Sequence, residues 1–323
     1  MKLPRRKFLF LAAGTAAARA FPRSASAGNY PTRPVRIIVP VPAGTGPDTI
    51  ARFVGQGLSD RLSGQFIVDN RPGAGTNIGI EFVVRAPPDG YTLLLFTTSA
   101  LTNATVYQNL NFNFIRDIAA VASIGRTRFV MVVTPSLPVK TVPEFIAYAK
   151  ANPGKINMAS IGVGSSPHIF GVLFQVMAGV DLIHVPYRGS YIPDLLSGQM
   201  QVYFGPTTSL IEYIRSGKLR ALGVTTATRL EVLPDIPTIA QFLPGYEAAG
   251  WNGIGAPKNT STDVIKKLNS AINAVVADPK SKVLFDNLGI EPVSMTPDEF
   301  GKLIAAETEK WAKVIKAAGI KAE

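Results

Sequence analysis

The chain alternates short apolar segments, rich in β-branched residues, with longer segments in which apolar residues recur at helical spacing. The first unit is Val35–Val39, followed by a turn of Pro, Gly and Thr residues and a helical pattern from Asp48 to Leu62. Apolar strands separated by helices are typical of a parallel sheet covered on both faces. Further predicted units are Phe66–Val68 with Ile78–Arg85, and Tyr91–Phe96.

A second series of strands and helices begins at Phe129–Thr134, after which Thr141 is placed to cap a helix over Val142–Ala151. The chain returns near Trp251 with a further strand. These series predict two α/β lobes joined by two crossovers, with residues 28–128 and 250–323 in lobe 1 and residues 129–249 in lobe 2. The other predicted strands are Ile156–Ser160, Leu182–Pro186, Met200–Phe204 and Leu219–Thr225, and the other helices are Pro167–Met177, Ile192–Ser197, Leu210–Ser216, Thr262–Ala277, Lys280–Asn287 and Pro297–Ala317.

The amino-acid composition indicates large buried cores and excludes several kinds of functional site. The 323 residues are 46% hydrophobic and 17% charged, which indicates large buried cores. There is no cysteine, so disulfides, thiolate metal sites and cysteine nucleophiles are excluded. The two histidines, His168 and His184, do not form a zinc-binding motif, and we expect neither a metal nor a cofactor.

The first 27 residues have the pattern of an export signal. They hold six basic residues and no acidic one, an apolar run from Phe8 to Ala18, and a small-residue end at Ala25-Ser26-Ala27. The run is shorter than the roughly 20 residues of a membrane-spanning helix. We therefore expect cleavage near Ala27 and export from the cytoplasm. Arg5-Arg6 resembles the twin-arginine signal, and export by the general secretory route stays open.

Net charge argues against a nucleic-acid partner. The formal charge of the whole chain is +11, and removal of the six basic residues of the first 27 leaves +5. The remaining lysines and arginines are scattered, whereas a nucleic-acid-binding protein needs a basic face.

Two glycine-rich loops could hold an anion. Residues 40–48 follow the first strand and open a helix, and residues 160–168 do the same in lobe 2. Small residues let a ligand approach backbone N–H groups, and a helix N-terminus adds partial positive charge. Ligands in parallel sheets bind beyond the carboxyl ends of the strands, where these loops gather. Each loop could instead be a tight turn in which Ser and Thr cap a helix.

The sequence has no motif that matches an enzyme active site well. Gly73-Ala74-Gly75 resembles a dinucleotide-binding loop, but its spacing is GxGxxxG and no acidic strand end follows at the required distance, so a turn with close helix packing is the better interpretation. No P-loop, GxSxG elbow or SxxK nucleophile is present. Ser166 and His168 are two residues apart and would not face each other on a helix. We expect no catalytic residue, and a dehydrogenase that uses the Gly73 loop is the alternative.

Nine stretches in order resemble the tripartite tricarboxylate transporter receptor family, also called Bug proteins, over essentially the whole mature chain. They are PTRPVRIIVPVPAGTGPD, VDNRPGAGTNIG, APPDGYTLL, INMASIGVGSSPH, HVPYRGS, DLLSGQMQ, SGKLRALGVTT, LPDIPTI and WNGIGAPKNT.

The resemblance implies a two-lobed, Venus-flytrap, type II-like periplasmic-binding-protein fold with a hinge of two crossovers. It implies a monomer that binds a small carboxylic acid and presents it to a membrane permease. The acid could be a di- or tricarboxylate, an aromatic acid or an acidic amino acid. A membrane sensor is the alternative partner. The implied ligand residues are Ala43, Gly44, Thr45, Ser160, Gly162, Ser165, Ser166 and His168, with Thr98, Ser99, Tyr187, Arg188, Gly189, Thr207 and Thr208 around the rest of the ligand.

The sequence departs from the family pattern at three points. Thr45 stands where glycine is usual, Gly205-Pro206 replaces a more polar pair, and the loop after Ser190 is about two residues short, with Tyr191-Ile192 in the gap. Since loops shape the pocket, we expect these changes to affect which acid is bound.

Overall fold

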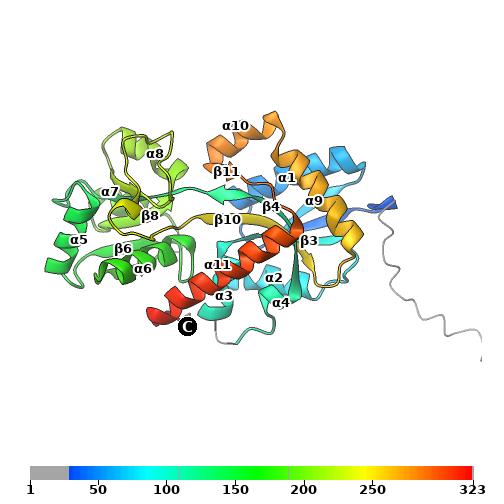
Figure 1. Ribbon diagram of the computed structural model, residues 1–323, viewed down its shortest axis with the longest axis horizontal. Coiled ribbons are helices and arrows are strands. Elements are labelled where there is room, and N and C mark those ends of the chain that lie inside the picture. The colour runs from blue at the N-terminus through cyan, green and yellow to red at the C-terminus, as the bar shows by residue number, and fades with distance from the viewer. Residues whose placement is uncertain (1–28, 108, 188, 322–323) are drawn as a thin grey trace, which may run out of the picture.

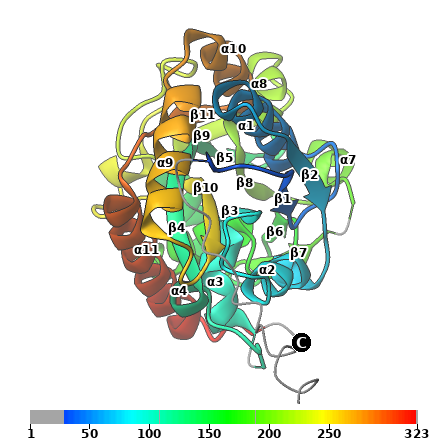
Figure 2. The same ribbon diagram turned by 90° about the vertical axis from the view of Figure 1, so that its right-hand side faces the viewer.

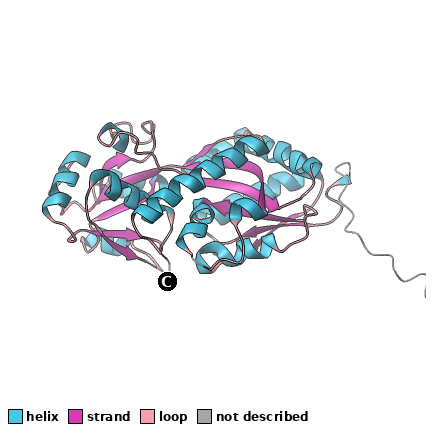
Figure 3. Cartoon of the chain, turned by 60° about the horizontal axis from the view of Figure 1, so that its bottom comes forward, coloured by secondary structure: helices cyan, strands magenta, loops and turns pink. Residues whose placement is uncertain are grey.

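The computed structural model describes residues 29–107, 109–187 and 189–321. The expected export signal and Arg188 lie outside these ranges. Two α/β lobes lie side by side, and two long strands run between them (Figure 1). Helices flank the strands in both lobes (Figure 3). Within the described ranges, no helix is both long enough and apolar enough to cross a membrane.

Lobe 1 is built on a six-stranded sheet. Its order is β11-β4-β10-β3-β1-β2. Four strands run parallel to one another, whereas β10 and β11 are antiparallel to them. The strands are β1 (Val35–Val39), β2 (Phe66–Asn70), β3 (Thr92–Thr97), β4 (Ile118–Thr127), β10 (Gly250–Pro257) and β11 (Ile290–Pro292).

Helices cover both faces of this sheet, as the continuous apolar strands require. Figure 2 shows α1 on one side of the strands and α2 on the other. Along β1, Ile37 packs into the core beneath α1 and α9, while Ile38 packs into the core on the opposite face. The helices are α1 (Gly46–Leu62), α2 (Asn77–Val84), α3 (Thr98–Val106), α4 (Phe114–Asp117), α9 (Thr262–Val276), α10 (Pro279–Leu288) and α11 (Pro297–Ala317).

Lobe 2 repeats this strand order. Its five-stranded sheet has the order β7-β6-β8-β5-β9, in which only β5 is antiparallel to its neighbours. The strands are β5 (Phe129–Val133), β6 (Asn157–Ser160), β7 (Ile183–Pro186), β8 (Val202–Pro206) and β9 (Arg220–Val224), and the helices are α5 (Val142–Ala151), α6 (Ser166–Ala178), α7 (Ile192–Ser197) and α8 (Thr207–Arg215).

In each sheet, the strand that enters after the chain has crossed from the other lobe is antiparallel to its neighbours. Arg128 alone separates β4 of lobe 1 from β5 of lobe 2, and β10 enters lobe 1 after the chain leaves β9. Thr225 ties the two crossovers together, because its hydroxyl donates to the carbonyls of Phe129 (3.2 Å) and Ala248 (2.7 Å). This pair of connections is the hinge of the fold.

Helix α11 belongs to the cores of both lobes. Phe300 and Ile304 pack in the lobe 1 core, whereas Trp311, Val314 and Ile315 pack in the lobe 2 core. In Figure 1 the helix runs diagonally from one lobe to the other. Thr296 begins it with a full capping box, in which the Thr296 and Glu299 side chains each accept from the other's backbone N–H.

The fold class predicted from sequence is confirmed, although four helices and strands were not predicted and the start of α8 was misplaced. The elements that were not predicted are α3, α4, β4 and β11. Helix α8 begins at Thr207, three residues before the predicted start at Leu210, so Thr207 and Thr208 form its first turn. The predicted cap at Thr141 is present, since its hydroxyl accepts the N–H of Glu144 at 3.3 Å.

Candidate ligand-binding site

The predicted ligand residues lie where strands of the two sheets end and helices begin. In lobe 1 these are the β1–α1 loop (residues 40–45) and the first turn of α3. In lobe 2 they are the β6–α6 loop (residues 161–165), the segment after β7 and the first turn of α8. All five places follow the carboxyl end of a parallel strand, which is where ligands bind in open α/β sheets.

The β1–α1 loop is held by its own hydrogen bonds. The N–H of Gly44 donates to Oδ2 of Asp48 at 2.9 Å, and the Thr45 hydroxyl donates to the carbonyl of Pro42 at 2.8 Å. Gly44 has φ +81°, a conformation that favours glycine. Ala43 and Gly44 are exposed, so the loop offers its backbone to the surroundings.

Asp48 stays ionised beneath this loop. Burial opposes its charge, but hydrogen bonds from Arg52, Gly44 and Asn70 outweigh burial and lower the pKa of Asp48. The carboxylate therefore anchors the start of α1, and Arg52 beside it, at 3.0 Å, offsets its negative charge.

In lobe 2, the Ser160 hydroxyl lies beneath the β6–α6 loop. Ser160 is fully buried, and its Oγ accepts the N–H of Gly162 at 3.0 Å. The same Oγ lies 2.6 Å from Nε2 of His184 and 3.2 Å from the carbonyl of Gly162. Ser165 closes the turn by donating its hydroxyl to that carbonyl at 2.6 Å.

The two histidines of the chain stack on each other below the same loop. Their ring centroids are 3.6 Å apart and their planes differ by 11°. Nδ1 of His168 accepts the N–H of Gly164 at 3.1 Å. Burial, and in second place the neighbouring His184, lower the pKa of His168 to about 3, and burial lowers the pKa of His184 to about 4. Both rings are therefore neutral at neutral pH.

The N-terminus of α6 keeps free donors. Ser166 begins the helix and is half-buried. In the described part of the chain, the N–H groups of Val163 and Ser166 have no acceptor. With the partial positive charge of the helix start, these groups can take a carboxylate.

Helix α3 joins the two lobes next to this loop. The Thr102 hydroxyl, fully buried, lies within hydrogen-bonding distance of two carbonyls, those of Ser99 (2.9 Å) and Gly164 (3.0 Å). Thr98 is also fully buried, and its hydroxyl accepts the N–H of Trp251 in β10 at 2.7 Å. Ser99 remains half-buried. Helix α3 thus contacts both the β6–α6 loop, through Thr102, and the hinge strand β10, through Thr98.

The predicted ligand residues after β7 and β8 differ from one another in burial and in hydrogen bonding. Tyr187 donates its hydroxyl to Asp194 at 2.5 Å, and burial together with this carboxylate raises the pKa of Tyr187 to about 12. Gly189 is exposed. Thr207 is buried with its hydroxyl on the carbonyl of Arg128 at 3.1 Å, and Thr208 is half-buried.

The family departures have local explanations. Tyr191, in the shortened loop, packs against Tyr203 with ring centroids 4.1 Å apart. At Gly205 an added Cβ would lie 2.1 Å from the Tyr203 ring, so only glycine fits there. Both departures thus surround one buried tyrosine.

The Gly73 loop is a strained turn, as the sequence indicated, with close packing around it. It forms a short 3-10 helix, η2 (Ala74–Thr76), in which Ala74 and Thr76 have positive φ. Nδ2 of Asn103 donates to the carbonyl of Gly75 at 2.9 Å, and Gly79 lies against Pro40. The turn therefore supports α3 and the start of the β1–α1 loop.

Thr102 and His184 are the residues of this region that the sequence did not single out as ligand-site residues. His184 could have been singled out in the stretch HVPYRGS, because it is one of only two histidines in the chain.

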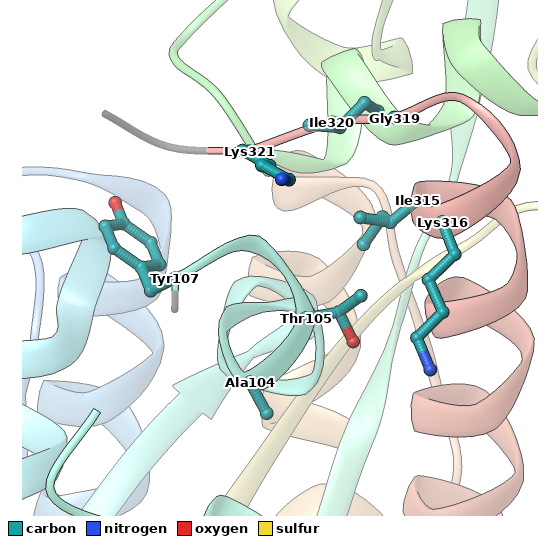
Figure 4. Close-up of a pocket in the computed structure, with 8 residues that line it drawn as sticks. All are labelled: Ala104, Thr105, Tyr107, Ile315, Lys316, Gly319, Ile320 and Lys321. Carbon is teal, nitrogen blue, oxygen red and sulfur yellow. The ribbon is translucent and has the colours of Figure 1, made fainter. Parts of the chain in front are cut away.

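A pocket of about 440 Å³ lies elsewhere, between the end of α3 and the end of α11 (Figure 4). None of the predicted ligand residues lines it, and Tyr107, Lys316 and Lys321 give it a mixed polar and apolar wall. The donor-rich loops, which carry the predicted ligand residues, are therefore the candidate carboxylate site. Within the described ranges no three His, Asp or Glu side chains gather as a metal site would require.

Comparison with known proteins gives consistent matches. Residues 50–320 match the family described as "Tripartite tricarboxylate transporter family receptor". Protein BugT of Bordetella pertussis is 35% identical over 301 residues, which cover 92% of each chain. Rpa4515 of R. palustris, solved with adipate, has a TM-score of 0.81 and 34% identity, covering 91% of this chain and 100% of that one.

A third relative extends the comparison. MatC of Rhodopseudomonas palustris, solved with bound malate, has a TM-score of 0.77 and 26% identity, covering 88% of this chain and all of that one. The family match spans most of the chain, and the two lobes have the fold of these solute-binding proteins. The chain belongs to the tripartite tricarboxylate transporter receptor family, the Bug family of solute-binding proteins.

Proposed function

We propose that the protein captures a small carboxylic acid between its lobes and delivers it for uptake by a tripartite tricarboxylate-type transporter. The observation that carries the proposal is the pair of loops at helix N-termini, one in each lobe, with backbone donors at the carboxyl ends of parallel strands. Relatives with adipate and malate bound support a carboxylate ligand.

In this proposal the ligand binds one lobe first, and closure about the hinge brings donors from the other lobe. A buried carboxylate left without hydrogen bonds would cost several kcal/mol, roughly, so both loops are needed. The lobes are taken as residues 28–128 with 250–323 and residues 129–249. The direct donors would come from residues 43–45 and from the β6–α6 loop with Ser166, while Ser99, Tyr187, Arg188, Gly189 and Thr208 would surround the rest of the ligand.

The ligand class in this proposal is a di- or tricarboxylate, an aromatic acid or an acidic amino acid. The protein acts without a cofactor and is not an enzyme. It works as a monomer in the periplasm after removal of its first 27 residues. Its partner is the membrane permease of the transporter.

The first experiment is mass spectrometry of the small molecules carried by natively purified protein, followed by calorimetry with adipate and malate. We expect a carboxylic acid at about one per chain. A nicotinamide nucleotide in its place, or no heat with any di- or tricarboxylate, aromatic acid or acidic amino acid, would contradict the proposal.

A further inference from the structure

The Ser160 hydroxyl is buried and fully used by the protein. Its Oγ accepts the N–H of Gly162 and is at hydrogen-bonding distance from both the carbonyl of Gly162 and Nε2 of His184. A hydroxyl has one donor and two acceptor positions, so these three partners saturate it. Ser160 has no hydrogen bond left for a ligand.

His168 is engaged in the same way from the other side of the loop. Its Nδ1 accepts the N–H of Gly164, and the residue is 4% exposed. Gly162 and Gly164 thus have their N–H groups turned toward Ser160 and His168. Because peptide groups are planar, fixing alternate N–H groups inward also fixes the peptides between them.

The N–H groups that are not held by Ser160 or His168 therefore have a fixed orientation. Val163 lies between the two anchored glycines, and Ser166 follows at the start of α6. Gly162 and Gly164 have φ of +126° and +77°, values at which only glycine is unstrained, so the alternation is built into the sequence.

His184 contacts both Ser160 and His168, the two side chains that hold the N–H groups of Gly162 and Gly164. Its ring stacks on His168 at 3.6 Å and its Nε2 holds Ser160, although it lies on β7, a different strand from the loop. We propose that His184 is a positioning residue, which, through Ser160 and the stacked ring of His168, fixes the β6–α6 loop so that the N–H groups of Val163 and Ser166 take the ligand carboxylate. This inference rests on the proposed function, and assigns His168 and Ser160 a supporting role beneath the ligand.

The test compares wild type, His184→Phe, Ser160→Ala and the double variant. Phenylalanine keeps a ring over His168 and deletes the bond to Ser160. Ser216→Ala is the matched control, since it removes a hydroxyl of the same size from an exposed position at the C-terminal end of α8, away from the candidate site. Affinity for adipate and malate is measured by calorimetry, and folding by the Tm of each ligand-free variant.

We expect each single variant to weaken binding about tenfold, which corresponds to the loss of roughly one hydrogen bond. Since both substitutions break the contact between His184 and Ser160, the double variant should bind no more weakly than the weaker-binding single variant. Ser216→Ala should bind like wild type. Unchanged affinity in both single variants, or multiplied losses in the double variant, would overturn the proposal.

Imidazole NMR provides a readout that does not depend on a ligand. The chain has two histidines, so untagged, histidine-labelled protein gives two sets of ring signals. In Ser160→Ala the Nε2 signal of His184 should shift, whereas in Ser216→Ala it should not. If His184→Phe does not fold, His184→Leu takes its place in the cycle, because leucine also has no group that could bond to Ser160. If wild type binds no acid, the proposed function fails, while the NMR result still decides whether His184 holds Ser160.

Discussion

The indole of Trp311 stacks on the ring of Phe170, with centroids 5.2 Å apart and planes 29° apart. Phe170 lies on α6 and Trp311 on α11, which begins in the lobe 1 core. Both residues are fully buried. The last helix of the chain therefore contacts the helix whose N-terminus carries the β6–α6 loop.

Replacement of Trp311 by alanine should lower the free energy of unfolding by about 3–5 kcal/mol, because it leaves a large cavity in the lobe 2 core. Trp311→Phe should cost less, since it keeps a ring on Phe170 and loses the bond from Nε1 to Glu307. Urea denaturation of both variants measures the difference. Equal losses would show that the stack itself contributes little.

The contact between Thr102 and Gly164 should stabilise the arrangement of the lobes. Thr102→Val keeps the shape of the side chain and leaves the Gly164 carbonyl without its partner, at a cost of about 1–3 kcal/mol. Thr105→Val, at a half-buried position three residues further along α3, is the control and should change stability little. Thermal denaturation distinguishes them, and equal Tm values would contradict the role of this bond.

Two glycines should differ in what a methyl group costs. At Gly44, φ is +81° and an added Cβ meets no atom within 4 Å, so Gly44→Ala should cost only about 1–2 kcal/mol of backbone strain. At Gly164, φ is +77° and the Cβ would also lie 3.2 Å from Val106. Gly164→Ala should therefore be the more destabilising in denaturant titrations. The reverse order would mean that Val106 yields without cost.

Stability should fall on mild acidification because of the two histidines. Their pKa values are lowered from 6.5 to about 3 and about 4 in the folded protein, so between pH 6.5 and those values the unfolded chain binds protons that the folded chain excludes. The stabilisation is complete above about pH 6.5 and is lost as the pH falls. The slope is at most about 1.4 kcal/mol per pH unit for each histidine, less at the half-buried His184 because solvent screens it.

Chemical denaturation between pH 5 and 6.5 measures this slope, since carboxyl groups with lowered pKa values, such as Asp48, titrate below that interval. The variant with His168→Leu and His184→Phe serves as control and should have a flatter profile. Parallel profiles for the two proteins would rule out the histidines as the cause.

The pattern of apolar residues was enough to predict most of the sheet but not its longest strand. Ala119, Ala120, Ala122 and Gly125 give β4 low intrinsic strand propensity. The strand forms because β10 pairs with it along its whole length, a contact made by residues more than 120 positions away. The sequence did not predict helix α3 for a similar reason. Its Thr and Asn residues are weak helix formers, and its stability comes from packing on α11.

The sequence predicted which loops form the candidate site, but not the contacts of individual atoms within them. Its spacing placed residues 160–168 between the end of a strand and the start of a helix, and the structure has the same arrangement. Whether Ser160 and His168 face a ligand or the core depends on His184, which is 24 residues from Ser160 and is brought there by β7 pairing beside β6. Sequence spacing carries no information on that tertiary contact.

The position of α11 also bears on the order in which the protein can fold. A chain still emerging from the ribosome lacks β10 until residue 257 has been made, and lacks Phe300 and Trp311 until those positions have been translated. Lobe 2 has a complete sheet earlier, but its core stays open on the side that Trp311 covers. Neither core can therefore be completed before α11 is synthesised, although most of the strands of both sheets precede this helix in the chain.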